Sequence, residues 1–174
     1  MRRTRATSRF RPVLLGLSLL ALTSPGVAAE RWVGLAVMPR LAIDVAFSPI
    51  HPELAADEVR PRIEEALRRG QPGPTLDPSS ADRLRLVISV RALSSSELRG
   101  YHLPLSQMYG IGPVRLAVER PAFVSGVAAP LPVVVWQTER LAKGPWRTSG
   151  REVLELVDEM VSAFLADYRR AQGP

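Results

Sequence analysis

The sequence predicts an α+β fold, a two-layer sandwich in which a mostly antiparallel sheet of four to five strands has two helices packed on one face. Two observations predict it. Several segments alternate apolar and polar residues with the period of a strand, and two others repeat apolar residues with the period of a helix. Short connections between the strands favour antiparallel pairing. We therefore expect a single domain over residues 30–174.

The first half of this domain contains a strand and a helix. Residues 32–47 are apolar and alternate toward their end, which predicts one long or broken strand with Pro39 at a bulge or an edge. A helix is expected from about 58 to 69, capped by Asp57, because four apolar residues share one helical face: Val59, Ile63, Ala66 and Leu67. A short strand near residues 75–76 would follow in the next loop.

Residues 83–93 give the clearest strand of the chain. Five apolar side chains fall on one face of it: Leu84, Leu86, Ile88, Val90 and Ala92. Three of the residues on the opposite face are arginines, as in a sheet with one dry and one wetter side. Ser94 to Ser96, which precede Glu97, are interpreted as a turn.

The stretch "GYHLPLSQMYGIG", residues 100–112, is either a ligand-binding loop or an irregular strand. Its apolar residues keep a period of two that continues to Val118, and a ligand-binding loop has no reason to keep that alternation. We therefore expect a strand over residues 101–118, paired with 83–93. Its proline and glycines would mark bulges or an edge: Pro104, Gly110 and Gly112.

The last third holds a connection, a strand and the longest helix. Residues 120–132 are a small-residue connection, and residues 133–141 form a strand that carries Trp136. Ser149 and Glu152 match a capping box for a helix from about 150 to 170. One stripe of that helix is apolar: Val153, Val157, Met160, Val161, Phe164 and Tyr168.

The first 29 residues are typical of an export signal. Five arginines without an acidic residue precede the apolar run "VLLGLSLLAL", and "VAA" supplies small residues for cleavage after Ala29. The apolar run of ten residues is shorter than the ~20 that span a bilayer. The sequence therefore predicts a periplasmic or secreted protein with no integral membrane span after cleavage; an uncleaved anchor is the alternative.

Cleavage changes the charge of the chain. The whole chain has 23 Lys and Arg against 17 Asp and Glu, and five of the arginines lie in the signal, so 18 basic and 17 acidic residues remain. A balance of +1 leaves no basic field for nucleic acid. The chain has no cysteine, so it has no disulfide, no thiolate nucleophile and no lipid-attachment cysteine.

The segments "LAADEVRPRIEEALRR", "RLVISV", "GYHLPL…PVRLAVERP", "VVVWQT" and "LVDEMVSAFLADY" together suggest a relative. The chain resembles a family of small exported bacterial proteins of unassigned function, in which a helix precedes two paired strands, a Trp-bearing strand and a closing "LVDxFxxDY" helix. It is similar, more loosely, to auxiliary envelope components of transport systems. The resemblance implies an exported location, this fold and a strand at residues 101–118, and it brings no catalytic residues.

The chemistry of an active site is poorly supported. No serine lies in a G-x-S-x-G pattern, and the chain has two histidines, His51 and His102. His51, Glu53 and Asp57 have no spacing that defines a metal geometry, and no phosphate-binding glycine loop is present. We expect no catalytic residue, no metal and no cofactor.

Two main functions remain compatible with these patterns. The first is a non-catalytic envelope module that binds another protein or itself, with a recognition patch formed by Tyr101, His102, Gln107 and Tyr109. The alternative is a small extracytoplasmic hydrolase that uses His102 or His51. Attachment to a membrane surface through the arginine-rich strand faces is a third option, and the near-zero mature charge argues against it.

Overall fold

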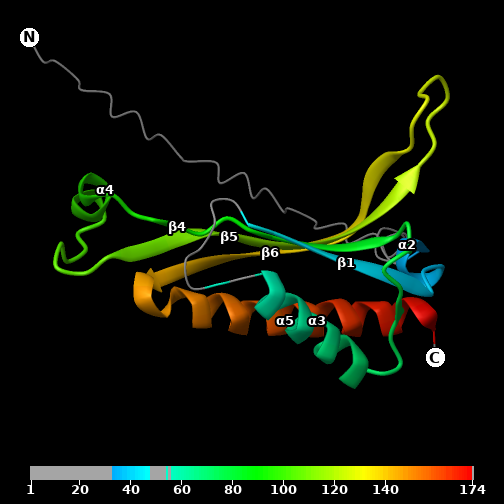
Figure 1. Cartoon of the computed structure of the whole chain (residues 1–174), viewed down its shortest axis with the longest axis horizontal. Helices are drawn as coiled ribbons and strands as arrows, with labels where there is room; N and C mark the ends of the chain where they lie inside the picture. Colours follow the sequence, from blue (N-terminus) through cyan, green and yellow to red (C-terminus); the bar gives the residue numbers. More distant parts are fainter. Residues whose placement is uncertain (1–32, 48–53, 55, 174) are drawn as a thin grey trace, which may run out of the picture.

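The computed structural model describes residues 33–47, 54 and 56–173, and within them it shows an α+β fold (Figure 1). A six-stranded, mostly antiparallel sheet is accompanied by four helices in this part of the chain. The expected counts of four to five strands and two helices are therefore wrong. The export signal and His51 lie outside the described residues.

The helices are α2 (Val33–Ala36), α3 (Ala56–Arg69), α4 (Ser95–Gly100) and α5 (Trp146–Gln172). The strands are β1 (Arg40–Phe47), β2 (Thr75–Leu76), β3 (Arg83–Ile88), β4 (Arg91–Ala92), β5 (Tyr109–Ala122) and β6 (Leu131–Pro145). None of the helices in this described part is both long and apolar enough to cross a membrane.

β5 is the central strand of the sheet. β3 and β4 follow one another along one of its edges and β6 pairs with the other edge, all antiparallel to β5. β1 lies between β2 and β3 and runs parallel to both. Parallel neighbours need a long crossover connection, which α3 provides between β1 and β3. The short strand expected at residues 75–76 is confirmed as β2.

The core lies between the sheet and the two long helices, α3 and α5, which cover one face of it (Figure 1). The apolar stripe predicted for α5 is confirmed, since all six of its residues are buried. Phe164 packs edge-on against Trp136, with ring centroids 5.3 Å apart. Complete burial of one such side chain stabilises the fold by about 1.5–3 kcal/mol.

The first predicted strand is only half right. Residues 33–36 form the short helix α2 instead, and the strand begins at Arg40. Gly34 explains the close fit of this helix against β6, because a Cβ on Gly34 would lie 2.9 Å from the Cβ of Val135. Asp57 lies in the first turn of α3 and not before it.

The strand predicted over residues 101–118 is wrong in its first half, because β5 begins at Tyr109. Ser94 caps α4 and Glu97 completes a capping box, so the helix forms where a turn was expected. After it, backbone N–H groups bond locally: those of Tyr101 and Leu103 donate to the carbonyls of Glu97 and Leu98. These groups are therefore not available for a sheet ladder.

The capping box predicted at Ser149 is also wrong, because α5 begins one turn earlier, at Trp146. The Ser149 hydroxyl donates to the Trp146 carbonyl inside the helix, at 2.6 Å. Glu152 accepts instead from the backbone N–H of Lys143, at 3.2 Å. Its carboxylate thus joins the end of β6 to α5.

The irregularities of β5 also differ from the prediction. The register of β5 against β6 shifts between Val118 and Glu119, opposite the extra residue Val135, and not at the predicted glycines. Gly112 has another role. A Cβ there would lie 2.0 Å from the Ser89 carbonyl oxygen, so the close approach of the segment between β3 and β4 requires glycine.

Candidate functional site

Two exposed apolar surfaces lie at opposite ends of the molecule (Figure 1). One is the arm, which we define as residues 119–134, the part of the β5–β6 hairpin beyond the register shift. The other is the α4 end, which we define as residues 93–111 together with the adjoining residues 143–147. β5 connects the two.

The arm exists because β5 and β6 are longer than their neighbour. β3 begins at Arg83, which pairs with Glu119, so beyond that pair the described sheet continues as a two-stranded hairpin. The extra residue at Val135 forms a bulge, and bulges bend the strand that carries them. Figure 1 shows the hairpin turning out of the plane of the sheet at this place.

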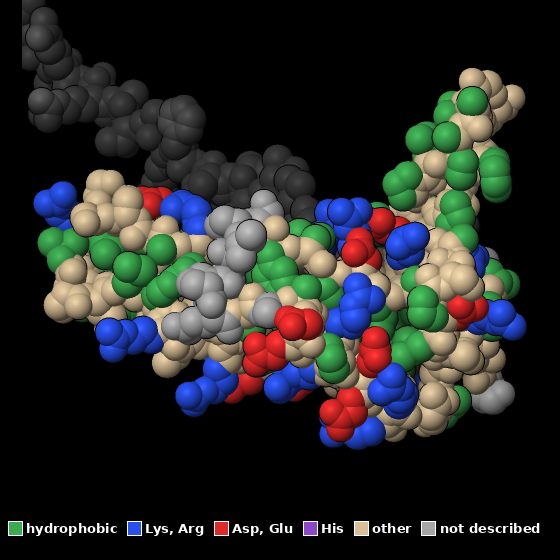
Figure 2. Space-filling view, in the orientation of Figure 1, with side chains coloured by type: hydrophobic (Ala, Val, Ile, Leu, Met, Phe, Trp, Pro, Cys, Tyr) green, Lys and Arg blue, Asp and Glu red, His purple; other side chains and the backbone are tan. Residues whose placement is uncertain are grey.

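The arm exposes apolar side chains and carries no charge in its outer part. Phe123 is 86% exposed, and five further side chains are exposed by 40–47%: Val124, Val127, Leu131, Val133 and Val134. No Asp, Glu, Lys or Arg occurs between Arg120 and Glu139. Figure 2 shows hydrophobic side chains along the arm and charged ones gathered at its base. Exposed apolar surface of this extent commonly marks an interaction site.

Paired charges fix the base of the arm to the body. The Arg120 guanidinium donates to both carboxylate oxygens of Asp82, at 2.9 and 2.7 Å. This hydrogen bonding raises the pKa of Arg120, against the opposing effect of its partial burial. Arg85 lies between Asp44 and Glu119, with N···O distances of 3.7 and 3.5 Å. These charged groups already form ion pairs within the chain, so the arm mainly offers apolar side chains to a partner.

Prolines limit how the arm can bind. Pro121 and Pro132 lie directly opposite one another in the hairpin. Because neither has an N–H to exchange, the pair suits a non-hydrogen-bonded site, where each missing N–H would have pointed to the open edge. Another strand added to the arm would lose donors on either side. The arm is therefore suited to contacts through its side chains rather than to sheet extension.

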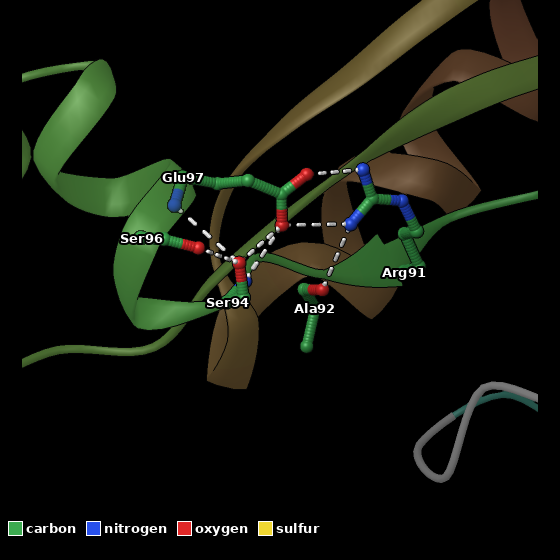
Figure 3. A network of polar contacts seen from close by, with 5 residues as sticks. All are labelled: Arg91, Ala92, Ser94, Ser96 and Glu97. Atoms are coloured by element: carbon green, nitrogen blue, oxygen red, sulfur yellow. Dashed lines mark hydrogen bonds and ion pairs between the residues drawn. The ribbon is translucent and has the colours of Figure 1, made fainter.

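The α4 end is organised by a polar network (Figure 3). The Arg91 guanidinium donates to both carboxylate oxygens of Glu97, at 3.0 and 2.5 Å. The Ser94 N–H donates to the same carboxylate at 2.9 Å, and the Glu97 N–H donates to the Ser94 hydroxyl at 3.4 Å. The Arg91 hydrogen bonds, followed by those of Ser94, lower the pKa of Glu97 to about 2.

Two hollows lie beside this network. One has a volume of about 340 Å³ and an almost entirely apolar lining that includes Leu93, Tyr101, Leu103, Tyr109 and Ile111. The other has a volume of about 770 Å³ and a mixed lining that includes Leu98, Leu105, Gln107, Met108 and Trp146. We call the first the apolar hollow. Its rim carries Lys143.

The four predicted patch residues are only partly brought together. Tyr101, which is 62% exposed, and Tyr109 line the apolar hollow, whereas Gln107 lines the larger one. His102 has a left-handed backbone (φ 55°) and an exposed side chain, and its N–H donates to the Arg99 carbonyl. Among the residues that the structure describes, no group of three acidic or histidine side chains could hold a metal ion.

Sequence reasoning misses the arm, because the composition of residues 120–132 predicts a connection of small residues. β5 in fact reaches Ala122, and β6 begins at Leu131. One signal was available: a charge-free run from Pro121 to Thr138 in a chain that is 23% charged. Such a run predicts burial, and its exposure becomes visible only when the neighbouring strand is seen to end.

Comparison with known proteins gives no assignment. The chain matches no protein-family profile and none of the curated proteins with which it was compared. Among solved structures it is similar to a variant PelC dodecamer from Paraburkholderia phytofirmans, with 14% identity, a TM-score of 0.39, and coverage of 74% of this chain and 86% of that one. This likeness is too distant to assign a function.

Proposed function

We propose that the chain is an exported, non-catalytic binding module of the cell envelope that docks on another protein molecule, either a different protein or a second copy, through the arm. The observation that carries the proposal is Phe123, which is 86% exposed in the charge-free outer part of the arm. Burial of apolar surface stabilises a complex by roughly 25 cal/mol per Å² before the costs of association. Aromatic side chains, phenylalanine included, are enriched in protein interfaces relative to the rest of the surface.

Export is supported by the basic, apolar and small-residue order of the first 29 residues and by the resemblance to small exported proteins. The mass of the protein isolated from the periplasm tests this part. We expect the mature chain to begin at Glu30. A full-length chain retained in the cytoplasm would contradict export.

The docking proposal is tested with a photo-crosslinking amino acid at Val124 in the full chain, expressed in its own host. We expect a crosslinked protein product that Phe123→Asp reduces more than tenfold, because loss of an interface aromatic costs about 2 kcal/mol or more. The same crosslinker at Arg68, exposed on α3, is the positional control. Val37→Asp, which changes an exposed apolar residue outside the arm, is the matched control substitution.

Absence of any protein product from position 124 would contradict the proposal, as would equal yields from Phe123→Asp and the wild type. Phe123 makes little contact with the body, so its substitution should leave the fold intact. Circular dichroism and the thermal midpoint check this for each variant.

A further inference from the structure

The two apolar surfaces of the molecule differ in shape, because one projects from the body and the other is hollowed. The arm projects Phe123 with a neighbouring valine, and the apolar hollow at the α4 end is a concave surface of about 340 Å³. A cavity of about 150 Å³ lined by apolar side chains holds a benzene molecule. The apolar hollow therefore has room for a phenyl ring and part of an adjoining aliphatic side chain.

The arm and the hollow of one chain cannot meet. β5 runs from Tyr109, which lines the hollow, to Ala122 in the arm, over 14 residues. At a rise of about 3.3 Å per residue, the two ends of the strand lie roughly 40 Å apart. β5 is also held on both edges by paired strands along most of this length. Contact between the two surfaces therefore requires two molecules.

We infer that the arm of one copy of this chain docks into the apolar hollow at the α4 end of a second copy. This inference rests on the proposed function and names the occupant. Phe123 enters the hollow and packs against Tyr101 and Tyr109 of the second copy, where offset or edge-on ring contacts are favourable. Val124 and Val127 cover the rim.

The size of the surfaces agrees with a specific contact. The six exposed apolar side chains of the arm offer on the order of 500 Å², whereas a standard protein interface buries about 800 Å² on each partner. Four smaller residues of the arm are exposed as well and add to this area: Ala128, Ala129, Pro130 and Pro132. On the receiving side, Leu105 and Met108 are each 56% exposed beside the hollow.

A protein recess suits the arm better than a lipid bilayer. Beyond Glu119 the described sheet gives neither strand of the arm an outer neighbour, so outward backbone carbonyls remain open there. Hydrocarbon would leave those carbonyls without partners, which is costly. At the α4 end, Lys143 and Arg147 lie on the rims of the two hollows and could donate to them.

Such a contact is heterologous, because it joins two different surfaces. After two copies have joined, one still has a free arm and the other a free hollow. Further copies can therefore add in the same way, and the assembly either closes into a ring or grows as an open chain. All copies have the same sequence, so every copy carries both the arm and the apolar hollow.

The natural absence of cysteine allows a direct test in the purified mature protein. Ser125→Cys places a thiol at the tip of the arm, and Lys143→Cys places one on the rim of the hollow. Mixing the two variants under mild oxidation should give a disulfide-linked dimer at least tenfold faster than mixing Ser125→Cys with Arg68→Cys. Adding Phe123→Asp to the arm variant should remove this advantage. Light scattering should show a mass above that of the monomer, which Phe123→Asp reduces to the monomer.

A monomeric wild type that forms no selective disulfide overturns the inference. If the photo-crosslinker at Val124 then still captures a different protein, the proposed docking function survives without it. Binding to vesicles of phosphatidylcholine and phosphatidylglycerol that Phe123→Asp abolishes, with no protein crosslink, would overturn both.

Discussion

The two ends of β5 are held in shape by different forces. At the α4 end, charged and hydroxyl side chains around Glu97 fix a short helix through hydrogen bonds that lie near the surface. In the arm, strand pairing and prolines fix the backbone, and the side chains that project from it are apolar. The stability of the α4 end should therefore depend on charge and pH, whereas substitutions of apolar residues in the arm should affect binding.

The largest effect expected concerns two phenylalanines with opposite environments. Phe164→Ala should lower the free energy of unfolding by about 3–5 kcal/mol, because Phe164 is fully buried between Trp136 and Tyr168. Phe123→Ala, the matched change in the arm, should stay within about 0.5 kcal/mol. Urea unfolding of both variants measures this. Similar losses in the two variants would mean that the arm packs against the body.

A smaller effect is expected at the cap of α4. Ser94→Ala removes the hydroxyl that accepts from the Glu97 N–H, and loss of such a cap costs about 1 kcal/mol. Amide exchange at Leu98 and Tyr101 should become faster while the midpoint of global unfolding changes little. Ser125→Ala in the arm is the control and should change neither. Unaltered exchange in Ser94→Ala would show that α4 does not depend on its cap.

The smallest effect is a pH dependence confined to the α4 end. The pKa of Glu97 is lowered from 4.5 to about 2, so the stabilisation by its ionised form is present above pH 4.5 and is lost as the pH falls toward 2. Residues 121–138, which include the outer part of the arm, contain no Asp, Glu, Lys, Arg or His, so their signals should not move in that range. A pH titration by NMR, followed at the Glu97 carboxyl and at the backbone amides of both regions, measures both, and Glu97→Gln should abolish the change at the Ser94 amide. A Glu97 midpoint near 4.5 would refute the network.

The sequence predicted the parts of the fold whose apolar pattern is long and is buried on one side only. The stripe of α5 and the alternation of β3 were identified because helix and strand periods differ over many residues. The segment at residues 101–108 failed because its period of two arises in a series of turns. The local capping signal at Ser94 and Glu97 was the stronger evidence there, and the same pattern at Ser149 was misleading because α5 had already begun.

The candidate site was less predictable than the fold. Tyr101 and Tyr109 were identified as surface residues of interest, and they do line one hollow. The shape of that hollow depends on α4 and on the turn at His102, neither of which was predicted. The arm was missed because an apolar run has the same composition whether a neighbouring strand covers it or not. The arm is exposed because β3 begins at Arg83 and does not extend alongside it.

Pro121 and Pro132 also bear on aggregation of the exposed arm. An extended, uncharged apolar segment is the type of sequence that stacks in register into amyloid-like cross-β fibres. Each stacked layer would lack the amide donors that proline has removed, so stacking is disfavoured at this pair, close to the turn of the hairpin. The same two residues should therefore disfavour fibre formation through the exposed apolar segment.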